Sequence, residues 1–345
     1  MSKKQERLSN FELLRIIAML LVLIVHADVF PFGLPSEIKS TNDIVRLFFQ
    51  CLSVTCVDIF VMISGWFGIN PNMKGFLKFI FQWLYFSIGI YIVMVLCGRL
   101  PLNGEGIINC FMLNQGGYWF ICSYLVLYIL SPILNSGVES LNRKQYKWML
   151  ISFFAFVFIY SWCFLQHEFL HGNSAIFFVG LYLLARFVRK HQPSFSALSK
   201  NIYIISFFII IILNTFILIS TILLHRGGIP VRMAMFYETP TTILAALILI
   251  IYFSKIHFTS KLINWVASSC FAVYLLHTHY GLLGEYANII KKLFYSHEGF
   301  VVLLSIGCFI IITFIVSIIA DQPRKWLWII IWKVIDKKKA KVSEA

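Results

Sequence analysis

Residues 201–224 read NIYIISFFIIIILNTFILISTILL, a stretch without a single charge. Residues 299–320, GFVVLLSIGCFIIITFIVSIIA, form a second stretch of this kind. A helix needs about 20 mostly apolar residues to cross a bilayer, so each stretch predicts a membrane-spanning helix. Neither stretch alternates polar and apolar residues, which excludes the strands of a membrane β-barrel.

The same pattern extends over the rest of the chain. Of its 345 residues, 59% are apolar and 13% are charged, with a mean hydropathy of +0.82. A soluble domain of this length cannot bury so much apolar surface, which excludes soluble enzymes, nucleic-acid binders and secreted disulfide scaffolds. The sequence therefore predicts an all-α, polytopic bundle of about ten transmembrane helices. The expected spans are 11–30, 44–69, 74–98, 117–135, 148–166, 174–189, 201–224, 239–256, 262–284 and 299–320.

The basic residues predict how the bundle is oriented. Ten spans place both termini on one side of the membrane. If that side is the cytoplasm, 21 of the 29 lysines and arginines fall in inner segments and seven in outer ones, with Arg15 inside the membrane. Positive charge collects on the cytoplasmic side, so both termini are predicted to be cytoplasmic. Topology and contacts with anionic lipid account for the net charge of +14, and we expect no nucleic-acid partner.

The expected organisation has three parts: a cytoplasmic N-terminus (1–10), a membrane domain (11–320) and a basic cytoplasmic tail (321–345). In the tail, residues 326–332 (WLWIIIW) are expected to form an interfacial helix and not an eleventh span. Ser9 and Glu12 fit a capping box at the start of the first span. The eight cysteines show no metal-ligand spacing, so we predict that they pack as small hydrophobes and that no metal is bound.

Four ionisable residues fall inside predicted spans, where such residues are costly and suggest function: Arg15, His26, Asp58 and His277. Arg15 and His26 are eleven residues apart, or three helical turns plus about 20°, which predicts one shared face and a separation of about 16 Å. Taken singly, Arg15 could reach lipid phosphate and a histidine could bond a neighbouring carbonyl. His26, Asp58 and His277 are expected at similar depth in the membrane, which favours a shared polar cavity. There, Asp58 is expected to pair with His26, Arg15 or His277.

These residues also carry a resemblance. The chain resembles the acyltransferase-3 family of bacterial integral-membrane acyltransferases, which modify the sugars of surface glycans. Six segments match the family's motifs in order: Arg15 with His26 (Arg-x10-His), 58–65 (DIFVMISG), 117–120 (GYWF), 177–180 (FFVG), 274–277 (YLLH) and 321–325 (DQPRK). Many relatives also carry an extracytoplasmic hydrolase-like domain. Nothing in this sequence corresponds to it, so transfer is expected within the membrane domain.

The resemblance implies a donor and its contacts. The co-substrate would be an acyl-CoA, most simply acetyl-CoA, arriving from the cytoplasm, with no bound cofactor. Donor contacts are expected from Arg15, Ser64, Lys74 and Lys78. The two lysines stand where the family often has arginines, and lysine lacks arginine's planar two-pronged contact. Gly65, beside Ser64, would allow close approach of a ligand or serve only as a packing notch between helices.

The resemblance also implies an acceptor, a hydroxyl of a lipid-linked or surface polysaccharide at the bacterial plasma membrane. His26 is expected to act as the general base, since imidazole takes up protons near neutral pH. Asp58 is expected to orient that imidazole. The acceptor pocket is predicted to use Tyr118, Trp119, Tyr274 and His277. Direct transfer is the preferred route, and an acyl-enzyme on Ser64 or His26 stays open.

One alternative is a non-enzymatic flippase or exporter of lipid-linked oligosaccharide. It would share the spans, the intramembrane charges and the basic inner face. It would not need an imidazole aligned with an arginine on one helix. A membrane glycan polymerase fits less well, because the outer loops are short. The acceptor sugar, O- against N-acylation and the oligomeric state stay open.

Overall fold

The computed structural model describes residues 8–111, 118–164, 167–225 and 236–343. No β-strand occurs among these residues, so the prediction of an all-α membrane bundle is confirmed. The first part of the expected N-terminus (1–7) and Gly117 lie outside the described residues. Six helical segments of the described chain are long and apolar enough to cross a bilayer: α1 (Ser9–Ala27), α3 with α4 (Thr41–Phe67), α5 (Met73–Leu96), α7 (Trp119–Ser140), α10 (Lys200–Leu223) and a segment of α16 (Phe300–Asp336).

Shorter helices stand at the other four expected spans and in the connections. They comprise α8 (Arg143–Phe156), which runs into a π-helical turn (Val157–Cys163), and α9 (Ala175–His191), α12 (Pro240–Ser254), α13 (Lys261–Ala267), α14 (Cys270–His277), α15 (Leu283–Ser296), α2 (Val29–Phe32) and α6 (Gly104–Asn109). Two short 3₁₀ turns lie at His167–Gly172 and Ser194–Ala197.

The prediction of one continuous span over 262–284 is wrong. Helix α13 ends at Ala267, α14 begins at Cys270, and α15 begins only at Leu283. The side chain of Ser268 donates a hydrogen bond to the Trp265 carbonyl at 2.6 Å. Serine side chains that bond the local backbone in this way compete with helical hydrogen bonding. Ser268, in this break, provides part of a cavity wall.

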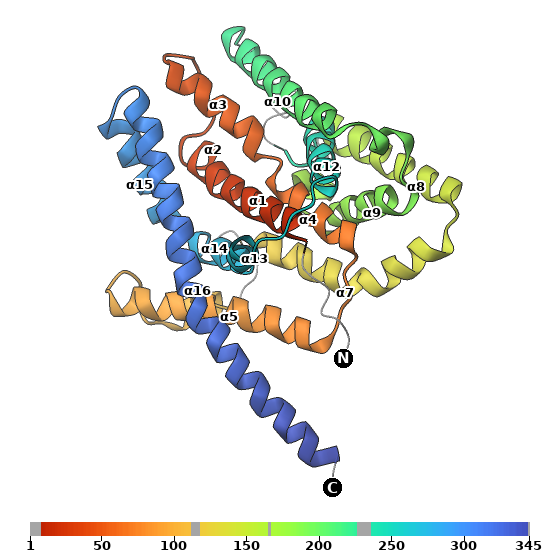
Figure 1. Cartoon of the computed structure of the whole chain (residues 1–345). Helices are drawn as coiled ribbons and strands as arrows, with labels where there is room; N and C mark the ends of the chain where they lie inside the picture. The colour runs from red at the N-terminus through yellow and green to blue at the C-terminus, as the bar shows by residue number, and fades with distance from the viewer. Residues whose placement is uncertain (1–7, 112–117, 165–166, 226–235, 344–345) are drawn as a thin grey trace.

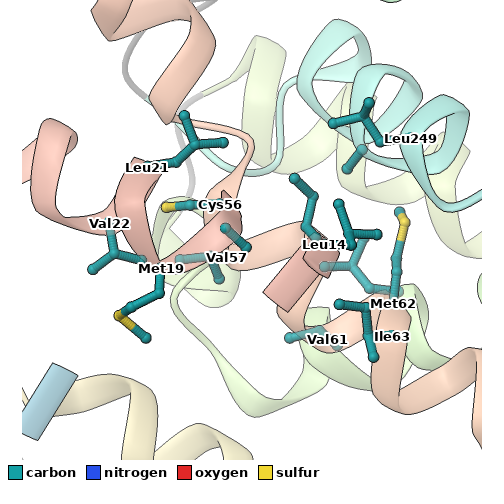
Figure 2. Close-up of a cluster of buried hydrophobic side chains, with 14 of the residues drawn as sticks. Leu14, Met19, Leu21, Val22, Cys56, Val57, Val61, Met62, Ile63 and Leu249 are labelled. Carbon is teal, nitrogen blue, oxygen red and sulfur yellow. The ribbon is translucent and has the colours of Figure 1, made fainter. Parts of the chain in front are cut away.

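Helices α1 and α4 (Cys56–Phe67) form the centre of the bundle (Figure 1). Helix α4 packs against α1, α9 and α12. Figure 2 shows this contact: Leu14 and Met19 of α1 face α4 side chains such as Val57. Leu249 reaches the same cluster from α12. A Cβ on Gly65 would overlap the backbone of Tyr182 on α9. Gly65 is therefore the packing notch between these two helices.

The predicted capping box at the start of α1 is wrong. The N-cap is Leu8, and it makes no side-chain capping bond. Ser9 instead donates to Asn264 Oδ1 at 2.9 Å and accepts from the Ser260 amide at 2.8 Å. Glu12 pairs with Arg15 one turn further along α1. Ser9 thus joins α1 to the start of α13, and Glu12 holds Arg15. Both side chains are buried in the bundle, where these partners lie closer than the amides at the end of the helix.

The final helix also differs from expectation. The α16 helix runs without a break from Phe300 to Ser343, with Pro323 inside it, so the final span and the expected interfacial helix are one element. The second half of α16 passes α5 and projects beyond the other helices (Figure 1). There, the rings of Trp328 and Phe81 lie 5.4 Å apart between centroids. The tail therefore packs partly on the start of α5.

Candidate active site

A cavity of about 290 Å³ lies between α1, α4, α5, α7 and the α13–α14 break. Arg15 and His26 both line it, as their eleven-residue spacing predicts. Aromatic side chains make up much of the remaining wall. The full lining is Arg15, Met19, Val22, Val25, His26, Cys56, Val57, Phe60, Ser64, Phe79, Trp119, Phe120, Tyr124, Tyr237, Ala267, Ser268, Cys270, Phe271 and Tyr274. The cavity therefore joins a cation near one end of α1 to an imidazole near the other.

His26 is held by His277, which is 1% exposed. The Nδ1 atom of His26 and the Nε2 atom of His277 are 3.0 Å apart, and His277 Nδ1 lies 2.6 Å from the Val273 carbonyl oxygen. A carbonyl can only accept, so His277 carries its proton on Nδ1 and, when neutral, accepts at Nε2. His26 must then donate from Nδ1. This arrangement makes Nε2 the basic nitrogen of His26.

Asp58 does not occupy the predicted place. Its side chain is completely buried, and among the described residues neither carboxylate oxygen has a hydrogen-bond partner. The expected pairing with His26, Arg15 or His277 is therefore wrong. The geometry of α4 explains the difference: Val57, Phe60 and Ser64 line the cavity, and Asp58 is turned about 100° from Val57 around the helix axis.

The predicted donor contacts divide into two groups. Arg15 and Ser64 line the cavity, whereas Lys74 and Lys78 are exposed and do not. The Lys74 ammonium lies 4.6 Å from the Trp332 ring centroid on α16. Ser64 Oγ donates to the Phe60 carbonyl at 3.2 Å and is 3.1 Å from the Tyr124 hydroxyl.

The predicted acceptor residues also divide. Trp119 and Tyr274 line the cavity, while His277 lies behind His26. Tyr118 is buried away from the cavity and donates to the Leu275 carbonyl at 2.6 Å. Sequence reasoning missed Tyr124, although it lies one helical turn after Phe120 and stacks on that ring at 5.7 Å. The four-residue spacing places Tyr124 on the same helix face as Phe120, and this could have identified it from the sequence.

Lys325 is a second residue that the sequence did not single out for the site. Its ammonium donates to the hydroxyls of Ser268 at 2.7 Å and Ser269 at 2.6 Å. Ser268 is exposed and lines the cavity. Lys325 lies in the matched segment 321–325, but only the folded chain brings α16 beside the break between α13 and α14.

The site therefore defines a class of protein. A partly buried imidazole whose Nε2 is the basic nitrogen, at the end of an aromatic cavity that begins at an arginine, can accept a proton from a substrate that enters the bundle. The family comparison agrees: the model of the acyltransferase domain matches residues 8–322. The chain belongs to the acyltransferase-3 family and is a multi-pass membrane acyltransferase. No curated protein and no solved structure matches it.

Proposed function

We propose that this protein transfers an acyl group, most simply acetyl, from acyl-CoA to a hydroxyl of a lipid-linked or surface polysaccharide at the bacterial plasma membrane. The observation that carries the proposal is the single cavity lined by both Arg15 and His26. The donor enters from the cytoplasmic side, with its anionic nucleotide near Arg15. Its thioester arm extends along α1 towards His26, and the acceptor reaches His26 from the opposite side.

The chemistry requires one base and no covalent enzyme intermediate. His26 Nε2 takes the proton of the acceptor hydroxyl while the hydroxyl oxygen attacks the thioester carbonyl. The tetrahedral intermediate then expels the CoA thiolate, which takes the proton back from the His26 imidazolium. An ester bond forms, a thioester bond breaks, and the imidazole returns neutral.

His277 keeps His26 ready for this step. By accepting a hydrogen bond from His26 Nδ1, it selects the tautomer of His26 whose Nε2 is basic. The same bond stabilises the His26 imidazolium that forms. This is the role that the sequence assigned to Asp58. Trp119 and Tyr274 supply aromatic faces on which a sugar ring can stack. Ser64 bonds to a carbonyl and a tyrosine, so direct transfer is favoured over an acyl-serine.

The test is acetyl transfer from radiolabelled acetyl-CoA to membrane or surface glycan, in cells that carry wild type or His26→Ala at matched protein levels. Loss of a general base is expected to lower the rate by about 10²–10⁴-fold. His297→Ala is the matched control, because His297 is exposed and its bond within the described part of the chain is to the carbonyl of the preceding residue.

Label that appears with wild type and the control, and disappears with His26→Ala, supports transfer through His26. Transfer that persists in His26→Ala contradicts the assignment of the base and leaves the enzyme class standing. If wild type transfers no label to a panel of glycans but moves lipid-linked oligosaccharide across the bilayer, the alternative of a flippase replaces the proposal.

A further inference from the structure

Ser268 is an exposed residue of the cavity wall, and we call the surface around it the mouth of the cavity. A lysine that bonds to Ser268, Lys325, is only partly neutralised. Lys325 is partly exposed, and its two closest partners are the uncharged hydroxyls of Ser268 and Ser269. Among the described residues its acidic neighbour is Asp321, which lies further away, at 3.6 Å. Asp321 already receives two hydrogen bonds from Arg324, at 2.8 and 2.9 Å. Lys325 therefore adds a positive charge that the Asp321–Arg324 pair does not cancel.

The other candidate cations are either neutralised or remote from the mouth. Arg15 lines the cavity but is paired with Glu12 on its own helix. Lys74 contacts the ring of Trp332, and neither it nor Lys78 lines the cavity. A phosphate that reaches Ser268 thus meets Lys325, whose carboxylate neighbour Asp321 is shared with Arg324.

An aromatic ring lies next to this lysine. Trp265 is 46% exposed, and its ring centroid is 5.8 Å from the Lys325 ammonium. Trp265 is on α13, one turn before Ser268, which forms part of the cavity wall. An exposed indole beside an ammonium offers the two contacts that a purine nucleotide uses, namely stacking on the base and a charge-assisted bond to phosphate.

We infer that Lys325 binds a phosphate of the donor's nucleotide and that Trp265 stacks on its purine. This inference rests on the proposed function, since it names the part of the same site that recognises the nucleotide. Lysine acts on phosphate as a compact point charge, which suits a group reached from one side. The serine hydroxyls hold the ammonium at the mouth while no donor is present.

The experiment compares two acetyl donors on purified protein: acetyl-CoA, and S-acetylpantetheine, which lacks the nucleotide. Lys325→Ala is expected to raise the KM for acetyl-CoA about tenfold or more, with little change in kcat and no change in the KM for S-acetylpantetheine. Lys325→Arg keeps the charge, so its KM for acetyl-CoA is expected to stay within about threefold of the wild-type value. Trp265→Ala is expected to raise only the KM for acetyl-CoA. The matched control is Lys333→Ala, an exposed lysine two turns further along α16.

Other outcomes overturn the inference. An equal change with both donors shows that Lys325 only fixes α16 against the α13–α14 break. No change with either donor shows that the nucleotide lies elsewhere. Failure of wild type to transfer from either donor would count against the proposed function itself. In that case, equilibrium binding of radiolabelled CoA decides the inference: weaker binding to Lys325→Ala than to Lys333→Ala supports it, and equal binding overturns it.

Discussion

The contact between His26 Nδ1 and His277 Nε2, 3.0 Å long, determines which nitrogen of His26 is basic. The eleven-residue spacing placed Arg15 and His26 on one face, because helical geometry is local. The partner of His26 depends on how α14 packs against α1, which no spacing records. The sequence predicts Asp58 as a partner because a buried carboxylate needs one, yet the structure gives the position to His277.

His277 can be tested by what its ring nitrogen accepts. His277→Phe keeps the bulk but removes the acceptor, so we expect the transfer rate to fall about 10–10²-fold, the worth of one hydrogen bond to a charged group. His277→Gln offers a carbonyl oxygen that can accept from His26 Nδ1, and it should restore part of the rate. Because the two histidines act as a unit, the double variant His26→Ala, His277→Phe should be no slower than His26→Ala alone.

The measurement is the initial rate of acyl transfer at saturating donor. The variants are compared at equal amounts of protein that stays soluble in detergent. Equal activity of His277→Gln and His277→Phe would show that His277 acts only through its volume. A double variant whose loss of activation free energy equals the sum of the two single losses would show that the two residues contribute separately to transfer.

At the scale of helices, apolar runs predicted where the helices lie, and polar contacts decided where they break or continue. Charge-free runs such as 201–224 became long helices because every backbone group in lipid must be satisfied internally. The break at Ser268–Ser269 and the continuity of α16 through Pro323 depend on contacts between distant segments. Lys325 bonds both serines from α16, and Trp328 packs on α5. Such contacts are fixed only when the helices assemble.

Gly65 allows a test of one such contact. Gly65→Ala would force its new methyl group into the Tyr182 backbone on α9, so we expect a loss of about 1–3 kcal/mol of stability. The matched variant is Gly89→Ala on α5, where an added Cβ meets no atom within 4 Å. That variant should be neutral or stabilising by up to about 1 kcal/mol, since alanine favours helix.

The midpoint of thermal unfolding in detergent, followed by fluorescence or by loss of monodisperse protein, separates the two glycine variants. A Gly65→Ala protein as stable as Gly89→Ala would mean that α4 and α9 can move apart at this point without cost. It would also remove the packing explanation for Gly65.

For the whole molecule, the class of fold was predictable from composition, and the number of crossings is the quantity that most needs a direct test. Both termini are predicted to be cytoplasmic because most of the basic residues then lie inside. A fluorescent-protein fusion at the C-terminus should fluoresce, while an alkaline phosphatase fusion there should be inactive. A phosphatase fusion within the 99–116 loop should be active. Phosphatase activity at the C-terminus together with a cytoplasmic N-terminus would require an odd number of spans.

The unbroken α16 helix ties this protein to the thickness of its bilayer. Its charge-free stretch, residues 300–320, is about 30 Å long at 1.5 Å per residue, which matches a hydrocarbon core of about 30 Å. The rest of the rod begins with the charged residues Asp321, Arg324 and Lys325 and therefore leaves the core. Lys325 stands about 37 Å along it from Phe300, which places it near the headgroups on the side where α16 ends. A thicker membrane favours a more upright rod, and with it a different depth of Lys325 relative to Ser268. The lipid composition around the enzyme is thereby coupled to the mouth of its cavity.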